Sequence, residues 1–274
     1  MKKHLICIDS DGCAIDSMEC KHRLCFGPLI IDVWHLEQWK DEILNRWNEI
    51  NLYSQMRGIN RFLGLEIMLS EVDSTYRKID GLFFYSRWCK ETTTYSNTAI
   101  EEQIRMKTHP IFELVLNWSN RVNSGVEKIA AQIKPFESVK ETLVMLHKNA
   151  DIAIVSSANP HAVQDEWTRF GLMEHVDYVM AQDAGTKTDC IAKLIKQGYK
   201  KDCVLMVGDA HADLDSANVN GVSFYPIIPG YEKESWGLLR DEVACMFLND
   251  CYESEYMNNR IHAFNTVLKD KSNQ

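Results

Sequence analysis

Short apolar runs that stop at polar residues constrain the fold of this chain more than any other feature. Three runs share the pattern: residues 4–8 before Asp9, residues 152–155 before Ser156, and residues 204–207 before Gly208 and Asp209. Short runs without polar alternation are typical of strands buried on both faces of a parallel sheet. Because open α/β sheets bind ligands at the carboxyl ends of their strands, the polar residues are expected to meet there. The pattern predicts an α/β fold.

The first polar cluster, Asp9-Ser10-Asp11-Gly12, carries two carboxylates separated by one residue and followed by a glycine. Two such carboxylates can share one Mg²⁺ and keep separate tasks. One can attack an electrophile while the other transfers protons. Taken alone, the pattern fits an ordinary acidic turn equally well, so its meaning depends on the other clusters.

Three further clusters follow in the chain. Ser156 and Ser157 follow their strand with small neighbours that let backbone N–H groups approach an anion. Lys187 follows a fourth apolar segment. Taken alone, a lysine is normally a surface residue. Asp209 ends its strand, and Asp213 follows on the first turn of an expected helix, where acidic residues also favour the helix dipole.

In order and context these clusters resemble the four motifs of the haloacid dehalogenase-like hydrolase superfamily, in its phosphatase and β-phosphoglucomutase-like branch. The matching residues are Asp9 and Asp11, Ser156, Lys187, and Gly208 with Asp209 and Asp213. The resemblance covers about residues 1–17 and 135–230 and is weaker between them. It implies a Rossmann-like parallel sheet core with an inserted all-helical cap domain.

The resemblance also implies a Mg²⁺-dependent phosphohydrolase that cleaves a small phosphomonoester. Asp9 is expected to attack phosphorus and form an aspartyl-phosphate. Asp11 is expected to protonate the leaving group and then activate water. Ser156 and Lys187 are expected to hold the phosphate oxygens, with Ser157 beside them in substrate binding.

The expected metal site consists of Asp9, the backbone carbonyl of Asp11, and Asp209. Asp213 completes it by orienting Lys187 or a metal-bound water. Hard oxygen ligands of this kind suit Mg²⁺. His211 lies within the same loop, and the preference of Mg²⁺ for oxygen makes it a neighbour of the site in this interpretation.

The motif positions predict two domains: a core of residues 1–17 and 135–274, and a helical cap of residues 18–134. Apolar residues at steps of three and four predict cap helices over residues 32–51 and 110–123. Tryptophans 34, 39, 47, 88 and 118 fall within the cap, where they are expected to fill the core of a helical bundle.

The cap segment 56–61 resembles the basic-Gly-x-x-Arg loop of β-phosphoglucomutase-like proteins. Its arginines, Arg57 and Arg61, are four residues apart and are expected to bind the distal part of the substrate. A solvated helix start explains them equally well. Lys21 and His22 lie where relatives often place a histidine, and the sequence leaves their contribution open.

Three alternatives remain open on the same fold. A phosphomutase requires a cap that returns the phosphoryl group before water arrives. A phosphonate hydrolase requires a cap lysine, for which Lys21 and Lys40 are candidates. An inactive binding protein is disfavoured, because it has no reason to keep converging charges at Asp9, Asp11, Lys187 and Asp209.

The composition limits the partners and the cellular compartment that are expected for the protein. The net charge of −9 disfavours nucleic acid as a partner, and a small phosphorylated metabolite is expected instead. Nine scattered cysteines without a secretory signal favour reduced thiols in the cytoplasm. No apolar stretch approaches the length of a membrane span. The sequence does not indicate an oligomeric state.

Overall fold

The computed structural model describes residues 1–268 in detail. By its internal contacts the chain divides into two compact units. One unit contains Met1–Ser17 and the chain from Ile133 onward, and the other contains Met18–Gln132. The two units are described separately as the core unit and the helical unit.

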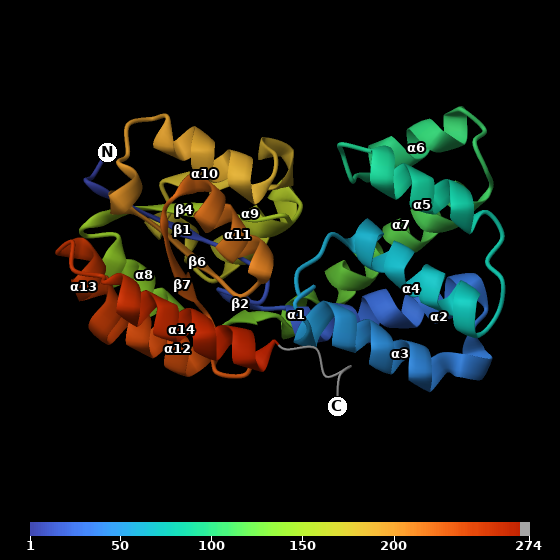
Figure 1. Ribbon diagram of the computed structural model, residues 1–274, viewed down its shortest axis with the longest axis horizontal. Helices are drawn as coiled ribbons and strands as arrows, with labels where there is room; N and C mark the ends of the chain where they lie inside the picture. Colours follow the sequence, from blue (N-terminus) through green and yellow to red (C-terminus); the bar gives the residue numbers. More distant parts are fainter. Residues whose placement is uncertain (269–274) are drawn as a thin grey trace. The chain divides into compact units, whose positions relative to one another are not determined.

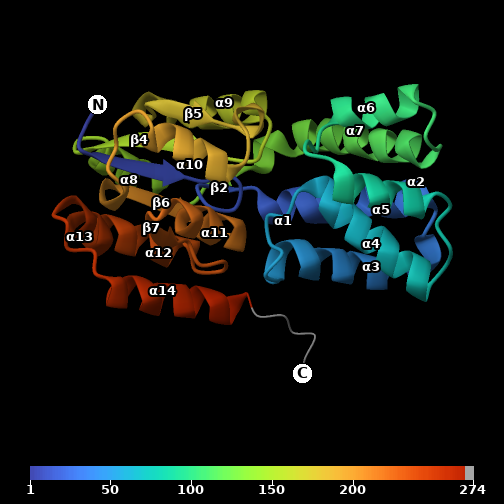
Figure 2. The same ribbon diagram turned by 45° about the horizontal axis from the view of Figure 1, so that its top comes forward.

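A five-stranded parallel sheet forms the centre of the core unit, in the order β5-β4-β1-β6-β7. Its strands are β1 (His4–Ile8), β4 (Ala150–Val155), β5 (Tyr178–Met180), β6 (Val204–Gly208) and β7 (Ser223–Pro226). β1 lies in the middle of the sheet (Figure 2) and is buried along its whole length. This central, doubly covered position explains its unbroken apolar sequence. The predicted α/β fold is confirmed.

Alternate residues of the strands point to opposite faces of the sheet, and helices cover both (Figure 1). On one face, Leu5 and Met206 pack against the helices α10 (Lys187–Ile195) and α11 (His211–Asn220). On the other, α8 (Val139–Leu146) contacts β4. The remaining helices of this unit are α9 (Pro160–Arg169), α12 (Glu232–Leu238), α13 (Ala244–Leu248) and α14 (Ser254–Val267).

A small antiparallel pair marks the points where the chain leaves and re-enters the core unit. β2 (Ile15–Asp16) pairs with β3 (Lys134–Pro135), so that Asp16 lies opposite Lys134. The segment between these strands contains more than a hundred residues, and its two ends lie next to each other where β2 pairs with β3.

Within the part of the chain that the structure describes, all regular elements of the helical unit are helices, and loops connect them. They are α1 (Met18–Lys21), α2 (Gly27–Trp34), α3 (Lys40–Asn48), α4 (Arg61–Thr75), α5 (Leu82–Glu91), α6 (Asn97–Arg105) and α7 (Ile111–Ile129), with π-helical turns at His22–Phe26 and Glu49–Tyr53. The helix predicted over residues 110–123 is thus α7, which continues six residues further. An all-helical insert is confirmed.

The single helix predicted over residues 32–51 is wrong. α2 ends at Trp34 because His35 adopts a left-handed conformation, with φ of 52°, and α3 begins only at Lys40. The apolar spacing nevertheless identified buried positions, since Leu36, Ile43 and Trp47 are all fully buried. The apolar periodicity therefore continues across the bend at His35, so the sequence pattern gives no sign of that bend.

The five tryptophans of the insert pack into or against the hydrophobic core of the helical unit. Trp47 and Trp118 are fully buried and meet edge to face, with ring centroids 6.3 Å apart. This packing agrees with the sequence-based expectation that the tryptophans fill the core of a helical bundle. Among residues 1–268, none of the helices combines the length and the apolar character that crossing a membrane requires.

Candidate active site

The carboxyl ends of three neighbouring strands bring the predicted site residues to one edge of the sheet. Asp9 follows β1, Ser156 follows β4, and Asp209 follows β6, with all three side chains buried. The backbone N–H of Asp9 donates to the carbonyl of Val207 at 3.0 Å, which extends the β1–β6 pairing to the first site residue. The sheet itself therefore fixes the position of Asp9.

Lys187 joins two of the predicted carboxylates. It is the first residue of α10, and the preceding Thr186 caps that helix by accepting a hydrogen bond from the N–H of Asp189. The Lys187 ammonium lies 2.7 Å from Asp9 Oδ2 and 2.6 Å from Asp213 Oδ1. Because all three side chains are nearly or fully buried, these ion pairs are shielded from water.

Asp213 holds the start of α11 as well as Lys187. Its Oδ2 accepts a hydrogen bond from the backbone N–H of Ala210 at 3.1 Å. The carboxylate lies so close to Gly208 that a Cβ there would approach Asp213 Cγ to 2.3 Å. The glycine of the Gly208-Asp209 pair is thus required by the position of Asp213.

The electrostatics of this group depend on burial and on the number of acidic neighbours. Burial raises the pKa of Asp9 to about 7, with Asp213 adding to the increase and Lys187 opposing it. Burial also raises the pKa of Asp213. For Lys187, burial acts to lower the pKa, but Asp213 and Asp9 outweigh it and raise the pKa above its ordinary value. The Lys187 ammonium therefore stays charged, but its single positive charge does not balance the negative charges of the carboxylates around it.

The donor set fits a hard divalent cation. Carboxylate oxygens of Asp9, Asp209 and Asp213 all lie within 4.8 Å of one another, and the three residues are buried. Three carboxylates facing one ammonium leave an excess of buried negative charge, which is costly without a further cation. Oxygen ligands at this spacing are those that Mg²⁺ prefers.

The side chain of Asp11 points to a different partner. Its carboxylate Oδ1 accepts a short hydrogen bond from the hydroxyl of Ser17, which is fully buried. Gly12, with φ of 79°, turns the backbone directly behind Asp11. The carboxylate of Asp11 is outside the acidic group described above, so only its backbone carbonyl remains a candidate for metal binding.

The two serines after β4 differ in exposure. Ser156 is buried, and its hydroxyl accepts a hydrogen bond from the backbone N–H of Ala158 at 3.2 Å. Ser157 is exposed. The substrate-binding roles of both stay predictions.

Two tryptophans that the sequence analysis did not single out support the loop that carries Asp9 and Asp11. The indole N–H of Trp167, on α9, donates to the hydroxyl of Ser10 at 2.9 Å. The indole N–H of Trp236, on α12, donates to the carbonyl of Cys13 at 2.8 Å. These partners are more than 150 residues apart in sequence, so no local pattern could have indicated them.

The predicted substrate arginines lie in the helical unit. Arg57 is buried, and its guanidinium donates to the carbonyl of Leu52 at 2.9 Å. Arg61, at the start of α4, donates to Asn123 at 2.7 Å and lies over the ring of Phe26. Both therefore have structural contacts within their own unit, and their roles in substrate binding stay predictions.

The three residues that the sequence left open have defined neighbours. The His22 ring stacks on Phe26, with centroids 4.7 Å apart, and Lys21 beside it is also buried. In the core unit, the imidazole Nε2 of His211 lies 2.9 Å from Asn265 Oδ1 on α14. His211 is thus directed toward α14 and is outside the acidic group.

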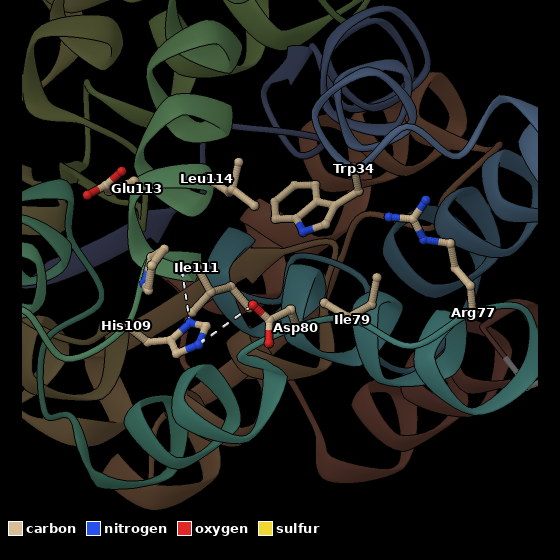
Figure 3. A pocket seen from close by; sticks show the side chains of 9 residues that line it. Trp34, Arg77, Ile79, Asp80, His109, Ile111, Glu113 and Leu114 are labelled. Atoms are coloured by element: carbon tan, nitrogen blue, oxygen red, sulfur yellow. Dashed lines mark hydrogen bonds and ion pairs between the residues drawn. The ribbon is translucent and has the colours of Figure 1, made fainter.

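The helical unit has a pocket of its own, with a volume of about 280 Å³ (Figure 3). It is lined by Trp34, Arg77, Ile79, Asp80, His109, Pro110, Ile111, Glu113 and Leu114. His109 accepts a hydrogen bond from the N–H of Ile111 at 3.2 Å, and its other ring nitrogen lies 3.9 Å from Asp80. None of the predicted substrate residues lines this pocket.

Comparison with known families agrees with this arrangement. The sequence profile of the haloacid dehalogenase-like hydrolases matches residues 77–227, which is more than half of the chain. This chain belongs to the haloacid dehalogenase-like hydrolases. The match includes Ser156, Lys187, Asp209 and Asp213 and begins after the segment that carries Asp9.

Solved structures resemble this haloacid dehalogenase-like chain at low identity. A predicted phosphoglycolate phosphatase from Haemophilus somnus 129pt is 14% identical with a TM-score of 0.51, covering 82% of this chain and 85% of that chain. A hydrolase from Pseudomonas syringae is 16% identical with a TM-score of 0.51, covering 85% and 89%. These similarities support the fold. No curated protein matches the sequence significantly.

Proposed function

We propose that this protein is a Mg²⁺-dependent phosphohydrolase that cleaves a small phosphomonoester through an aspartyl-phosphate on Asp9. The observation that carries the proposal is the buried group in which Lys187 lies between Asp9 and Asp213 beside Asp209. Placement of such a group at the carboxyl edge of a parallel sheet is typical of ligand sites in open α/β folds. Membership of a hydrolase family and the phosphatase named among its structural neighbours agree with it.

Each residue has a task that follows from its surroundings. Asp9 Oδ2 is paired with Lys187, so Oδ1 is the oxygen left to attack phosphorus, although it also accepts from the N–H of Ser10 at 2.7 Å. That N–H turns the carboxylate and fixes the direction of attack. Lys187, charged and buried, stabilises the negative charge that develops on the transferred phosphoryl group.

Asp11 is the residue proposed to transfer protons. The Ser17 hydroxyl donates to one carboxylate oxygen, which directs the other toward the leaving group and later toward the attacking water. Asp9, Asp209 and the backbone carbonyl of Asp11 would hold Mg²⁺, with Asp213 orienting Lys187. When bound, Mg²⁺ would neutralise the charge that otherwise keeps a phosphate from a carboxylate nucleophile.

The substrate is proposed to be a small phosphorylated metabolite. Ser156 and Ser157 would bind phosphate oxygens, whereas Arg57 and Arg61 would bind the distal part of the substrate. The outcome of the reaction decides between the alternatives on this fold. Release of inorganic phosphate from a phosphomonoester identifies a phosphohydrolase, its release from a phosphonate identifies a phosphonate hydrolase, and a phosphorylated isomer identifies a mutase.

The test is turnover of an aryl phosphate with Mg²⁺, with and without EDTA, by the wild-type protein and by Asp9→Asn. We expect EDTA to abolish activity and Asp9→Asn to lower kcat/KM by at least roughly 10⁴-fold, as for lost nucleophiles in other hydrolases. The matched control is Asp215→Asn, an exposed carboxylate on α11 two residues from Asp213. It should remain fully active.

The covalent intermediate is tested separately by trapping. Acid quenching during turnover of a ³²P-labelled substrate should leave label on the wild-type protein and none on Asp9→Asn. Substantial activity in Asp9→Asn, or equal labelling of both proteins, would contradict the proposal.

A further inference from the structure

A second group of metal-binding side chains lies at the opposite edge of the sheet. His4, Cys203 and Asp250 each place one ligand atom within 4.8 Å of the others. They come from three separate segments: the start of β1, the residue before β6, and the loop after α13. The acidic group of Asp9 lies at the carboxyl ends of these same strands, so the two groups are separated by the length of the sheet.

Two of these residues are fixed by the sheet. Leu5 pairs with Val204 in the parallel register, which puts their predecessors, His4 and Cys203, side by side at the amino ends of β1 and β6. Both are buried, with 4% of each exposed. The His4 ring also packs edge to face against Phe247, with centroids 5.2 Å apart. Ligands held on rigid elements lose little freedom when they bind a metal ion.

Asp250 reaches the pair from the solvent side. Its Oδ1 lies 3.2 Å from His4 Nε2, and its Oδ2 lies 2.5 Å from the ammonium of Lys3. Lys3 therefore engages one carboxylate oxygen and leaves the other directed at the histidine. A carboxylate oriented by a neighbour through its second oxygen is a common arrangement around metal ligands.

We propose that His4, Cys203 and Asp250 form a binding site for one Zn²⁺. Nitrogen, thiolate sulfur and carboxylate oxygen are the ligands of zinc, and a water molecule would complete the tetrahedron. Ligand atoms around tetrahedral zinc lie about 3.3–3.8 Å apart, so side-chain shifts of about 1 Å close the group on an ion. Binding replaces the thiol proton of Cys203 by the metal and releases that proton to solvent.

Zinc at this position would connect the first strand to the segment that follows α13. Mg²⁺ is excluded by the ligand chemistry, because it requires six oxygen ligands and binds thiolate and imidazole poorly. The proposal is therefore independent of the phosphohydrolase reaction, and the thiolate of Cys203 distinguishes this metal site from the acidic group of Asp9.

Cobalt substitution provides the test. Protein freed of metal with EDTA is titrated with Co²⁺, whose thiolate complexes absorb in the near ultraviolet through charge transfer from sulfur. The acidic residues of the active site offer only oxygen donors, which give no such band, and persistence of the band in Asp209→Asn checks that it does not arise there. We expect one equivalent of Co²⁺ to produce the band and one equivalent of Zn²⁺ to remove it.

Variants assign the ligands. Cys203→Ser should abolish the band, and Asp250→Asn should weaken zinc binding by at least about tenfold, the lower end for a disturbed metal shell. The controls are Cys245→Ser, an exposed thiol on α13, and Asp209→Asn in the active site, both of which should keep the band.

Absence of the band in the wild-type protein would overturn the proposal, as would a band that persists in Cys203→Ser. Unchanged zinc affinity in Asp250→Asn would overturn the three-ligand site. Asp250 is on a loop with its side chain 54% exposed, so this variant folds even where Cys203→Ser does not. Thermal unfolding in EDTA checks that each variant is folded.

Discussion

The hydroxyl of Ser17 donates a hydrogen bond to the carboxylate of Asp11, the residue proposed to transfer protons. Ser17 is the last residue of the core unit before the insert begins, and it is fully buried. A donor to one carboxylate oxygen restricts the rotation of the Asp11 side chain. In the proposed mechanism, Ser17 therefore acts through Asp11 as a positioning residue.

Replacing Ser17 by Ala should therefore affect proton transfer more than phosphate binding. We expect kcat for an alkyl phosphate, whose leaving group must be protonated, to fall about tenfold, the equivalent of one hydrogen bond to a charged group. An aryl phosphate with an acidic leaving group should lose much less. Ser17→Thr, which keeps the hydroxyl, should restore activity on the alkyl substrate. Equal losses on both substrates would assign Ser17 to folding.

Gly208 makes a second prediction at the residue scale. A methyl group there would lie 2.3 Å from Asp213 Cγ, so Gly208→Ala must displace the carboxylate that holds Lys187. We expect a loss of phosphatase activity of at least about tenfold. The matched control is Gly237→Ala on α12, where a Cβ would meet nothing within 4 Å. It should keep full activity and gain about 0.5–1 kcal/mol in unfolding free energy. Full activity of Gly208→Ala in steady-state assays would contradict this account of the site.

At the scale of elements, β4 carries a buried carboxylate that ties neighbouring segments to the sheet. Asp151 accepts hydrogen bonds from the Tyr199 hydroxyl at 2.5 Å and from the backbone N–H of Lys2 at 2.7 Å. Burial acts to raise the pKa of Asp151, but these hydrogen bonds and the charge of Lys2 outweigh it and hold the pKa below its ordinary value. The folded state therefore favours the charged form.

The pH dependence follows from this sign. A carboxylate with a lowered pKa in the folded state stabilises the protein above its unfolded pKa of about 3.9, and the stabilisation is lost as the pH falls through the folded value. Asp151→Asn should cost about 1.5–3 kcal/mol at pH 7, with a smaller difference from wild type near pH 3. Urea unfolding at several pH values measures it, with the exposed Asp202→Asn as control. A difference independent of pH would show that the carboxylate charge is irrelevant.

The strands and helices also show which parts of the fold could be predicted from the sequence and which could not. The α/β fold was predictable because β1, β4 and β6 are each buried on both faces, which requires the apolar runs that the sequence displays. The helix break at His35 was not, because a left-handed residue there leaves the apolar spacing of its neighbours unchanged.

Contacts between residues that are distant in sequence are a second kind of feature that the sequence could not predict. The contact of Trp167 with Ser10 and the contact of Trp236 with Cys13 depend on tertiary packing and leave no local signal. The grouping of Asp9, Lys187 and Asp213 was expected from the resemblance to the four family motifs, and each of them lies at the end of a strand or in the first turn of a helix. The sequence explained Arg57 equally well as a substrate-binding residue or as a solvated one, whereas its guanidinium binds a backbone carbonyl inside its own unit.

At the scale of the whole molecule, the core unit contains its complete sheet and a hydrophobic cluster drawn only from its own residues. A chain in which Ser17 is joined to Ile133 by a short Gly-Ser linker should therefore fold. We expect cooperative thermal unfolding and the far-ultraviolet circular dichroism of an α/β protein, because the removed residues contribute no strand to the sheet. Loss of a cooperative transition would show that the insert is needed for the core to fold.

The antiparallel pairing of β2 with β3 has a consequence for the history of such a chain. Because Asp16 and Lys134 lie opposite each other, the insert leaves and returns through neighbouring positions, whatever its length. The entropy of closing a loop grows only with the logarithm of its length, by about 0.6 kcal/mol for each doubling. An insertion at this point can grow, shrink or be exchanged without moving a strand of the sheet. Recombination there would replace the helical unit and leave the sheet, with the residues at the carboxyl ends of its strands, in place.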